Sequence, residues 1–383
     1  MTKAPTLPKA LINRYILAIQ YHGTPYHGFS KQPSFRTVEG DLTEALDRLV
    51  GNGNHHNMQV SSRTDRGVHA LFNTLHVDIA CRDNENRMLN PNEIKRGLNY
   101  YLARGGIKSS AGKWQQYDPS NIHVRVLHAD RAPLHRAYSK HNYDVHPRHV
   151  QHTAICRMYV YRMLITDVHD GDYWFPFERD RAWHVRCNDA HYRRNDIHVH
   201  GDEGDRIRSK LDVKAMRDAA HILTGTHDFT SFRNRGCVRS TPITTLYGIH
   251  IDQVDYAQSS GWDVDNLLRN SNSSNDETTT TCIGDDDSSL LWRHNQQLWH
   301  KPSQAELIRI LFTGKSFLYR QVRNMVGCLA QVGLGKLSAE DVRCALEGRD
   351  RRLLSAPLAP AHGLTLVDVR HEGYEFPSDD GAL

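Results

Sequence analysis

The stretch SSRTDRGVHAL, residues 61–71, decides how the first part of the chain is interpreted. It sits between two short segments, residues 60–62 and 74–79, that we predict to be strands. Arg63 and Asp65 are two residues apart, so on a strand their side chains would share one face, and Gly67 predicts a turn directly after them. A functional carboxylate held out at a strand end fits this pattern. A turn-closing ion pair between Arg63 and Asp65 fits it equally well.

The neighbouring segments alternate between strand-like and helix-like patterns. Residues 14–21 (RYILAIQY) predict a buried strand, and residues 37–50 predict an amphipathic helix with Thr37 as its N-cap. Residues 90–102, which open with Asn90 and Pro91, predict a second helix. This alternation is typical of an α+β fold in which helices pack on one face of a sheet.

A similar set of elements recurs later in the chain. Residues 156–164 and 307–313 predict strands, and residues 212–223 predict a helix capped by Asp212. A last helix is expected over residues 316–332, with Arg320 and Arg323 beside a core-facing stripe. That stripe consists of Leu318, Val322, Met325, Leu329 and Val332. With 383 residues, the chain is expected to form two domains or one large two-lobed body.

Charge and composition narrow the classes of function. The net charge is +4, but residues 252–289 contain nine acids and one base, so this segment carries −8 and the rest of the chain +12. A body of +12 suits a polyanionic partner, and evenly solvated basic side chains explain it as well. Seven scattered cysteines without a CxxC pair disfavour a disulfide framework and a thiolate zinc site. No apolar run approaches the roughly 18 residues that span a bilayer, so no membrane association is expected.

The motif at residues 61–71 resembles the catalytic motif of the TruA class of tRNA pseudouridine synthases. Other segments resemble the same family in the same order: YHGTPYHGFSKQP (21–33), TVEGDLTEAL (37–46), DVHPR (144–148), RMYVY (157–161), LTGTHDFTSF (223–232), SFLYRQVRNMVG (316–327) and APAHGL (359–364). FLYRQVR, VGLGKL and APAHGL are most similar to the animal tRNA pseudouridine synthase-like branch. The chain departs from the family pattern at Arg66, where Ala is usual, and at Val145, where Phe is usual.

The resemblance implies an architecture. We expect α+β organisation with two similar lobes, each a largely antiparallel sheet with helices packed on one face, whose sheets meet at a central RNA-binding cleft. A flexible tail is expected at residues 1–13, an N-terminal lobe with the Asp motif at 14–145, a C-terminal lobe at 146–372 and a second tail at 373–383. Polar, low-complexity insertions are expected near residues 192–209 and 255–289.

The same resemblance implies partners and a compartment. It implies tRNA as the partner, a homodimer that forms the cleft, and no nucleotide, metal or other cofactor. The compartment stays open between mitochondrial and cytoplasmic or nuclear. The family branch slightly favours mitochondria, and the N-terminus, with Lys3, Lys9 and Arg14 and no acid before Glu39, is weakly like a presequence.

The resemblance also assigns the chemistry. Pseudouridine formation breaks the bond between uracil N1 and ribose C1′, turns the base and rejoins it through C5, and it requires a nucleophile. Asp65 corresponds to that nucleophile, with attack on C1′ or on C6 left open, and Arg323 corresponds to its carboxylate partner. Tyr159 corresponds to the residue that stacks on the base and transfers a proton. Arg63 is expected to hold the flipped nucleotide's phosphate or to fill the gap that the base leaves. Substrate contacts are also expected from His69, Phe317 and Leu318, each of which suits a core position as well.

Two other functions fit parts of the sequence. The 25 histidines, with Asp65 near His69, suggest a metal hydrolase, but no H-E-x-x-H motif is present, and His198 and His200 fall in a predicted insertion. A non-catalytic RNA-binding or tRNA-folding protein on the same scaffold would use the basic body without a buried carboxylate. The joint presence of Asp65, Tyr159 and Arg323 counts against that alternative.

Overall fold

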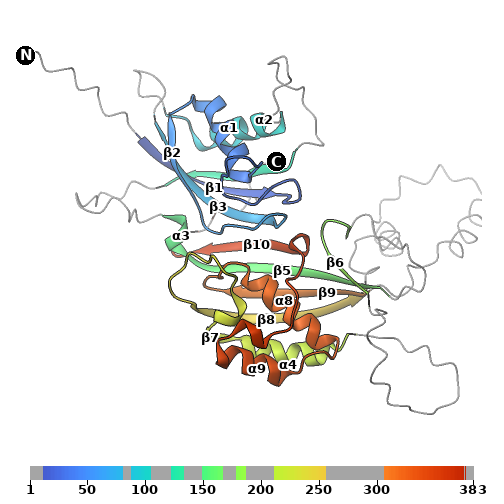
Figure 1. Ribbon diagram of the computed structural model, residues 1–383. Coiled ribbons are helices and arrows are strands. Elements are labelled where there is room, and N and C mark those ends of the chain that lie inside the picture. Colours follow the sequence, from blue (N-terminus) through green and yellow to red (C-terminus); the bar gives the residue numbers. More distant parts are fainter. Residues whose placement is uncertain are drawn as a thin grey trace, which may run out of the picture.

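The computed structural model describes residues 12–80, 88–104, 122–132, 149–166, 178–186, 211–255, 306–374 and 376. Within these residues ten strands form one mostly antiparallel sheet in the order β4-β1-β3-β10-β5-β9-β8-β7, with β2 paired to β3 and β6 to β5 (Figure 1). The strands are β1 (Ile12–Tyr21), β2 (His55–Val60), β3 (His69–Ala80), β4 (Val124–Arg131), β5 (Ala154–Thr166), β6 (Trp183–Arg186), β7 (Gly225–Asp228), β8 (Ile243–Asp255), β9 (Glu306–Gly314) and β10 (Leu364–His371). The helices are α1 (Val38–Val50), α2 (Pro91–Ala103), α3 (Val150–Thr153), α4 (Val213–Leu223), α8 (Gln321–Gly333) and α9 (Ala339–Gly348), with short 3₁₀ helices η4 (Thr230–Phe232), η5 (Arg351–Leu353) and η6 (Ala361–Gly363).

In the N-terminal part, β1 pairs antiparallel with β3 on one side and β4 on the other. Helix α1 begins after Thr37, whose hydroxyl accepts a hydrogen bond from the Gly40 amide. Helix α2 begins after Asn90, which forms a reciprocal capping box with Glu93. Both predicted helices and the predicted N-cap Thr37 are therefore confirmed, and Asn90 is the cap of the second helix.

In the C-terminal part, β5, β9, β8 and β7 form an antiparallel series, and α4, α8 and α9 lie in front of it (Figure 1). Helix α4 begins after Asp212 as predicted. The prediction for α8 is wrong at its start, because Arg320 adopts a left-handed conformation (φ 60°) and the helix begins only at Gln321. The residues before it form a loop in which the Leu318 amide donates to Gln321 Oε1. The predicted apolar stripe is nevertheless buried throughout.

The two parts meet at a short parallel pairing. Thr365 of β10 lies opposite His69 of β3, and Leu366 lies opposite Ala70, while the other edge of β10 pairs antiparallel with β5. The sheets therefore join edge to edge into one continuous sheet. The α+β class, with a mostly antiparallel sheet and packed helices, is confirmed. Because β3 starts at this junction, the residues just before it lie next to β5 and β10.

Residues 61–68 of the SSRTDRGVHAL motif form a loop between two strands, in agreement with the predicted turn. Strand β2 ends at Val60 and β3 begins at His69, so Arg63 and Asp65 lie in the loop and do not share a strand face. Hydrogen bonds with a neighbouring segment hold the loop. The Thr64 carbonyl accepts from the Phe29 amide and the Gly67 amide donates to the Tyr26 carbonyl, so this backbone pairs with a neighbouring loop and not with a strand. Gly67 has φ 79°, a conformation that favours glycine.

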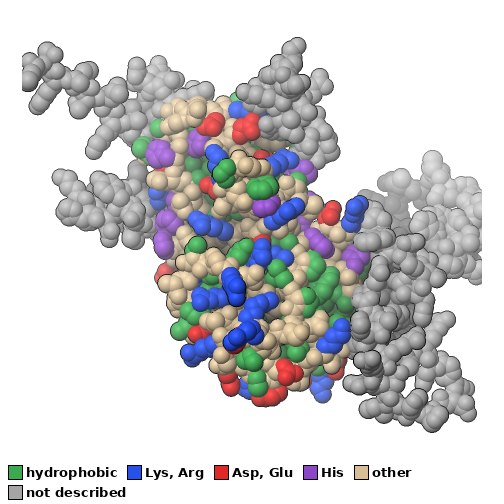
Figure 2. Space-filling model, viewed as in Figure 1, with side chains coloured by type: hydrophobic (Ala, Val, Ile, Leu, Met, Phe, Trp, Pro, Cys, Tyr) green, Lys and Arg blue, Asp and Glu red, His purple; other side chains and the backbone are tan. Residues whose placement is uncertain are grey.

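Several expectations fall outside the described residues: the segment 144–148, the insertion at 192–209, nearly all of 255–289 and most of both tails. No described helix is long and apolar enough to cross a membrane. On the face shown in Figure 2, Lys and Arg side chains gather across the middle of the molecule, where α8 lies in Figure 1.

Candidate active site

Asp65 and Arg323 form an ion pair at the junction of the two parts. Nη1 of Arg323, in the first turn of α8, lies 3.2 Å from Oδ2 of Asp65, and the two side chains are 11% and 18% exposed. The Arg323 Nε donates to the Ala359 carbonyl at 2.8 Å, so the guanidinium is held by two oxygen acceptors and contacts the carboxylate at one point. Arg63 is exposed and forms no ion pair with any described residue. The alternative of an ion pair between Arg63 and Asp65 is therefore wrong.

A network of buried polar side chains holds the backbone of the Asp65 loop in place. The hydroxyls of Tyr21 and Thr64 are 2.8 Å apart, and Asn73 Nδ2 donates both to the Tyr21 hydroxyl and to the Ser62 carbonyl. Burial raises the pKa of Tyr21, so the phenol stays neutral. These bonds satisfy polar groups that would otherwise be costly to bury, and they fix the backbone on both sides of Arg63.

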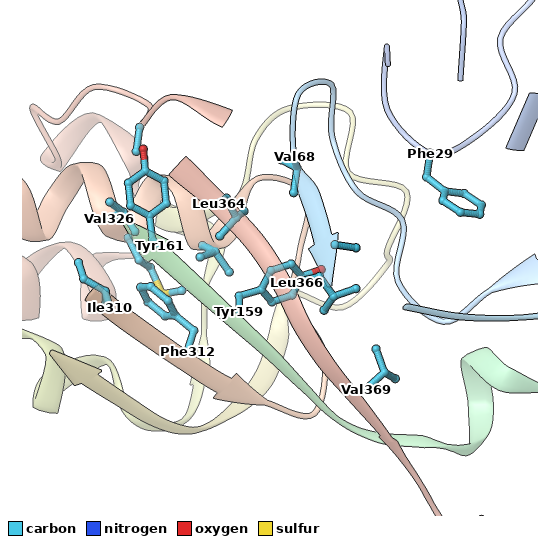
Figure 3. Packing of buried hydrophobic residues seen from close by; sticks show 14 of the residues in the cluster. Phe29, Val68, Tyr159, Tyr161, Ile310, Phe312, Val326, Leu364, Leu366 and Val369 are labelled. Carbon is cyan, nitrogen blue, oxygen red and sulfur yellow. The ribbon is translucent and has the colours of Figure 1, made fainter. Parts of the chain in front are cut away.

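Tyr159 lies beside this loop on β5. Its hydroxyl is 2.6 Å from Ser62 Oγ and points toward the start of β3 (Figure 3), and the ring of Phe317 packs edge-on at 5.2 Å between centroids. Tyr159 is only 6% exposed. Burial raises the pKa of its phenol, and the negative charge of Asp65 raises it further. A base can reach the ring face of Tyr159 only if neighbouring side chains such as Phe317 move.

Arg157 is a residue of this region that the sequence interpretation did not single out. Its guanidinium is buried and donates to the backbone carbonyls of Ser61, Gln151, Ala154 and Lys315. Burial lowers its pKa. It joins the Asp65 loop to the end of β9. The signal was present in RMYVY, because an arginine two residues before Tyr159 on a strand shares its face.

The remaining predicted substrate residues differ in their placement. His69 is buried, with Nδ1 accepting from the Gly23 amide and Nε2 donating to the His362 carbonyl, and burial lowers its pKa to about 4. It therefore braces two loops as a neutral imidazole. Leu318 is 4% exposed and belongs to the core, whereas Phe317 is half-buried against Tyr159. Among the described residues, no group of three or more His, Cys, Asp or Glu side chains is placed to hold a metal ion.

Comparisons with known proteins find tRNA pseudouridine synthases. A family model described as tRNA pseudouridine synthase matches residues 219–372. The tRNA pseudouridine synthase A of Caulobacter sp. (strain K31) is 29% identical over 360 residues, covering 94% of this chain and 98% of the relative. The proteins of the same name from Xanthobacter autotrophicus and Maricaulis maris are 29% and 28% identical, each over 94% of this chain and over 99% and 98% of their own lengths.

These matches, together with the two-part sheet and the covered carboxylate between its parts, define a pseudouridine synthase, which is an isomerase. Within that class, the chain is similar to the TruA-type tRNA pseudouridine synthases, which match it along most of its length.

Proposed function

We propose that this protein isomerises a specific uridine of tRNA to pseudouridine, and that Asp65 is the nucleophile. One observation carries the assignment of the nucleophile: the Asp65 carboxylate is paired with Arg323 in a largely covered position, beside the hydroxyl network of Ser62 and Tyr159. A carboxylate that attacks must be held in a fixed direction and shielded from bulk water, and the adjacent guanidinium holds one of its oxygens in place.

Asp65 forms and then releases one covalent bond in this scheme. If it attacks C1′, the bond from C1′ to N1 breaks and its electron pair leaves with the uracil. After the base turns, C5 bonds to C1′ and the carboxylate is released. If it attacks C6, the carboxylate adds across the C5–C6 double bond, the bond from N1 to C1′ breaks and C5 bonds to C1′. Loss of the C5 proton then re-forms the C5–C6 double bond as the carboxylate leaves. Arg323 contacts the carboxylate at one oxygen, which leaves Oδ1 without a described partner and free to attack.

Tyr159 is proposed to contact the base and to assist removal of the C5 proton. Its raised pKa disfavours a standing phenolate, so the phenol can accept a proton only as it passes its own proton on. Ser62 Oγ, 2.6 Å away, is the described neighbour placed to relay this proton, and because a serine hydroxyl cannot keep a second proton it passes its own proton on to solvent. Arg63, exposed and free of any described acidic partner, is proposed to hold the flipped nucleotide.

Finer assignments rest on the sequence motifs. The segments FLYRQVR, VGLGKL and APAHGL support a place near the animal tRNA pseudouridine synthase-like branch. We also propose a homodimer, because a broad basic cleft suits a folded tRNA, and a mitochondrial location, which the basic N-terminal residues support. Gel filtration with light scattering and imaging of the tagged full-length chain test these two proposals.

The activity is tested with unmodified tRNA transcripts that carry tritium at uridine C5. Purified protein is incubated with cytosolic and organellar sets, and tritium release is followed by mapping of pseudouridine in the transcripts that react. We expect release from a subset of transcripts at one uridine position. Tight binding of the transcripts without any release would contradict the proposed activity and favour a non-catalytic RNA-binding protein.

A further inference from the structure

An aromatic pair stands exposed on the loop next to Asp65. The rings of His27 and Phe35 are stacked, 4.0 Å apart between centroids with 12° between their planes. Phe35 nevertheless remains 55% exposed. An exposed phenylalanine supported on one face by another ring presents its other face outward as a flat apolar surface.

The pair is rigidly held. The His27 amide donates to the Arg36 carbonyl at 2.8 Å, which closes the loop directly behind Phe35. The Gln32 side chain contacts His27 twice: its amide nitrogen donates to the His27 carbonyl, and its oxygen lies 3.0 Å from His27 Nδ1. A side chain fixed in this way loses little conformational entropy when a ligand stacks on it.

The pair is also tied to the Asp65 loop. The Phe29 amide donates to the Thr64 carbonyl at 3.1 Å, and the Gly67 amide donates to the Tyr26 carbonyl at 3.3 Å. His27 lies between these two contacts in sequence. The aromatic pair therefore has a fixed position relative to Asp65 and occupies a site separate from Tyr159.

The aromatic loop and the adjoining Asp65 loop carry several exposed cations. Lys31, Arg63 and Arg66 are exposed and form no ion pair with any described residue, whereas Arg36 is paired with Asp41 and Glu39 accepts from the Lys31 amide. A flat aromatic surface beside free cations is what proteins use to bind single-stranded nucleic acid, because the bases stack on the rings while the cations contact the phosphates. Arg66, which stands where the related family usually has Ala, adds a cation to the Asp65 loop, and its backbone passes close to Gly28, the neighbour of His27.

We propose that Phe35, supported by His27, is a second base-binding site that stacks an unpaired nucleobase of the tRNA near the target uridine. This inference rests on the proposed function for its choice of RNA. It assigns Phe35 to substrate positioning and selection, not to the reacting atoms.

Phe35→Ala, Phe35→Leu and Phe35→Trp test the site. For each variant we measure binding to an unmodified transcript of the tRNA that the enzyme uses as substrate, and steady-state tritium release from it. Thermal melting checks folding. The stacking of a base on an aromatic ring contributes to the free energy of binding. We therefore expect Phe35→Ala and Phe35→Leu to weaken tRNA binding and to raise KM by about tenfold. We expect kcat to stay within about twofold, and Phe35→Trp to bind at least as well as the wild type.

Tyr100→Ala provides the matched control. Tyr100 is also an exposed aromatic residue, 52% exposed with Arg104 over its ring, but it lies on α2. The Tyr100→Ala protein should bind tRNA with the same affinity as the wild type. Wild-type affinity in Phe35→Leu would overturn the proposal, and so would equal losses in Phe35→Trp and Phe35→Ala. If the wild type binds tRNA but releases no tritium, the proposed function fails, while the binding series still decides the fate of this site.

Discussion

Nη1 of Arg323 lies 3.2 Å from Oδ2 of Asp65, although the two residues are 258 positions apart in the chain. The Arg323 side chain also bonds the carbonyl of Ala359, and the Ala359 amide donates back to the Arg323 carbonyl. Contacts within the C-terminal part therefore fix the position of the guanidinium independently of its contact with the Asp65 carboxylate. The candidate site exists only where the loop before β3 and the first turn of α8 come together, so its geometry depends on the junction between the two parts.

Arg323→Gln and Arg323→Lys test this pairing. Glutamine removes the charge and leaves Asp65 without its described cation, so we expect kcat to fall by roughly 100-fold or more, as for loss of a preorganised charged partner. Lysine keeps the charge but cannot bond Asp65 and Ala359 with one planar group, and it should retain intermediate activity. Rates are measured by tritium release at saturating tRNA. Equal rates in all three proteins would remove Arg323 from its proposed role.

Two tyrosines on β5, Tyr159 and Tyr161, allow a proposed catalytic hydroxyl to be compared with a structural one. Tyr159→Phe removes the hydroxyl beside Ser62, and we expect kcat to fall by about 100-fold with tRNA affinity unchanged. Tyr161 lies two residues further along the same strand. Tyr161→Phe removes a hydroxyl that donates to the Pro360 carbonyl. It should cost about 1 kcal/mol of stability and leave kcat nearly unchanged. A Tyr159→Phe enzyme as fast as Tyr161→Phe would show that the Tyr159 hydroxyl has no part in the reaction.

Arg157 is expected to act through the backbone that it holds. Arg157→Gln leaves the carbonyls of Ser61 and Lys315 without their buried donor, and we expect a loss of about 3 kcal/mol in the free energy of unfolding. Arg309→Gln is the control, because Arg309 lies on the neighbouring strand β9, is 44% exposed and pairs with Asp252, which is 42% exposed. Urea unfolding compares the two variants. A loss in Arg157→Gln no larger than in Arg309→Gln would contradict this role.

Buried histidines predict how stability depends on pH. Burial lowers the pKa of His69 and of His371 to about 4, below the value of 6.5 for an exposed imidazole. Between these values the unfolded chain binds more protons, so stability is complete above about pH 6.5 and falls as pH drops toward 4. The loss reaches up to about 3 kcal/mol for each histidine.

His69→Asn checks this prediction, because asparagine can still accept from the Gly23 amide and donate to the His362 carbonyl but does not titrate. Urea unfolding at pH 7.5, 5.5 and 4.5 should show a shallower pH dependence for the variant than for the wild type. An identical pH dependence in both proteins would show that His69 makes no contribution to it.

Local sequence signals predicted most elements correctly because their causes are local. Thr37, Asn90 and Asp212 cap helices through hydrogen bonds within a single turn, and the stripe from Leu318 to Val332 follows from the helical period. The start of α8 was predicted too early because apolar spacing continues through Leu318, whereas the left-handed Arg320 depends on the loop around it. The Asp65 segment was predicted as a turn between two strands, but its backbone bonds to a loop about 40 residues earlier could not be predicted from local sequence.

The candidate site was predictable only in part. Asp65, Arg323 and Tyr159 carry recognisable motifs, and the structure places Asp65 against Arg323 and Tyr159 against the same loop. Contacts between distant segments bury His69 and Leu318. Such contacts also bring together the backbone carbonyls around Arg157. No spacing rule encodes such contacts. The stacking of Phe35 on His27 was not foreseen, because it depends on how one loop closes.

The central claim is that Asp65 is the nucleophile, and one comparison tests it most directly. Tritium release from C5-labelled tRNA is measured under single-turnover conditions for the wild type and for Asp65→Asn, with tRNA binding and thermal melting recorded for both. We predict release by the wild type only, with both proteins folded and both binding tRNA. Equal release by a folded Asp65→Asn protein would contradict the claim and remove Asp65 from the mechanism.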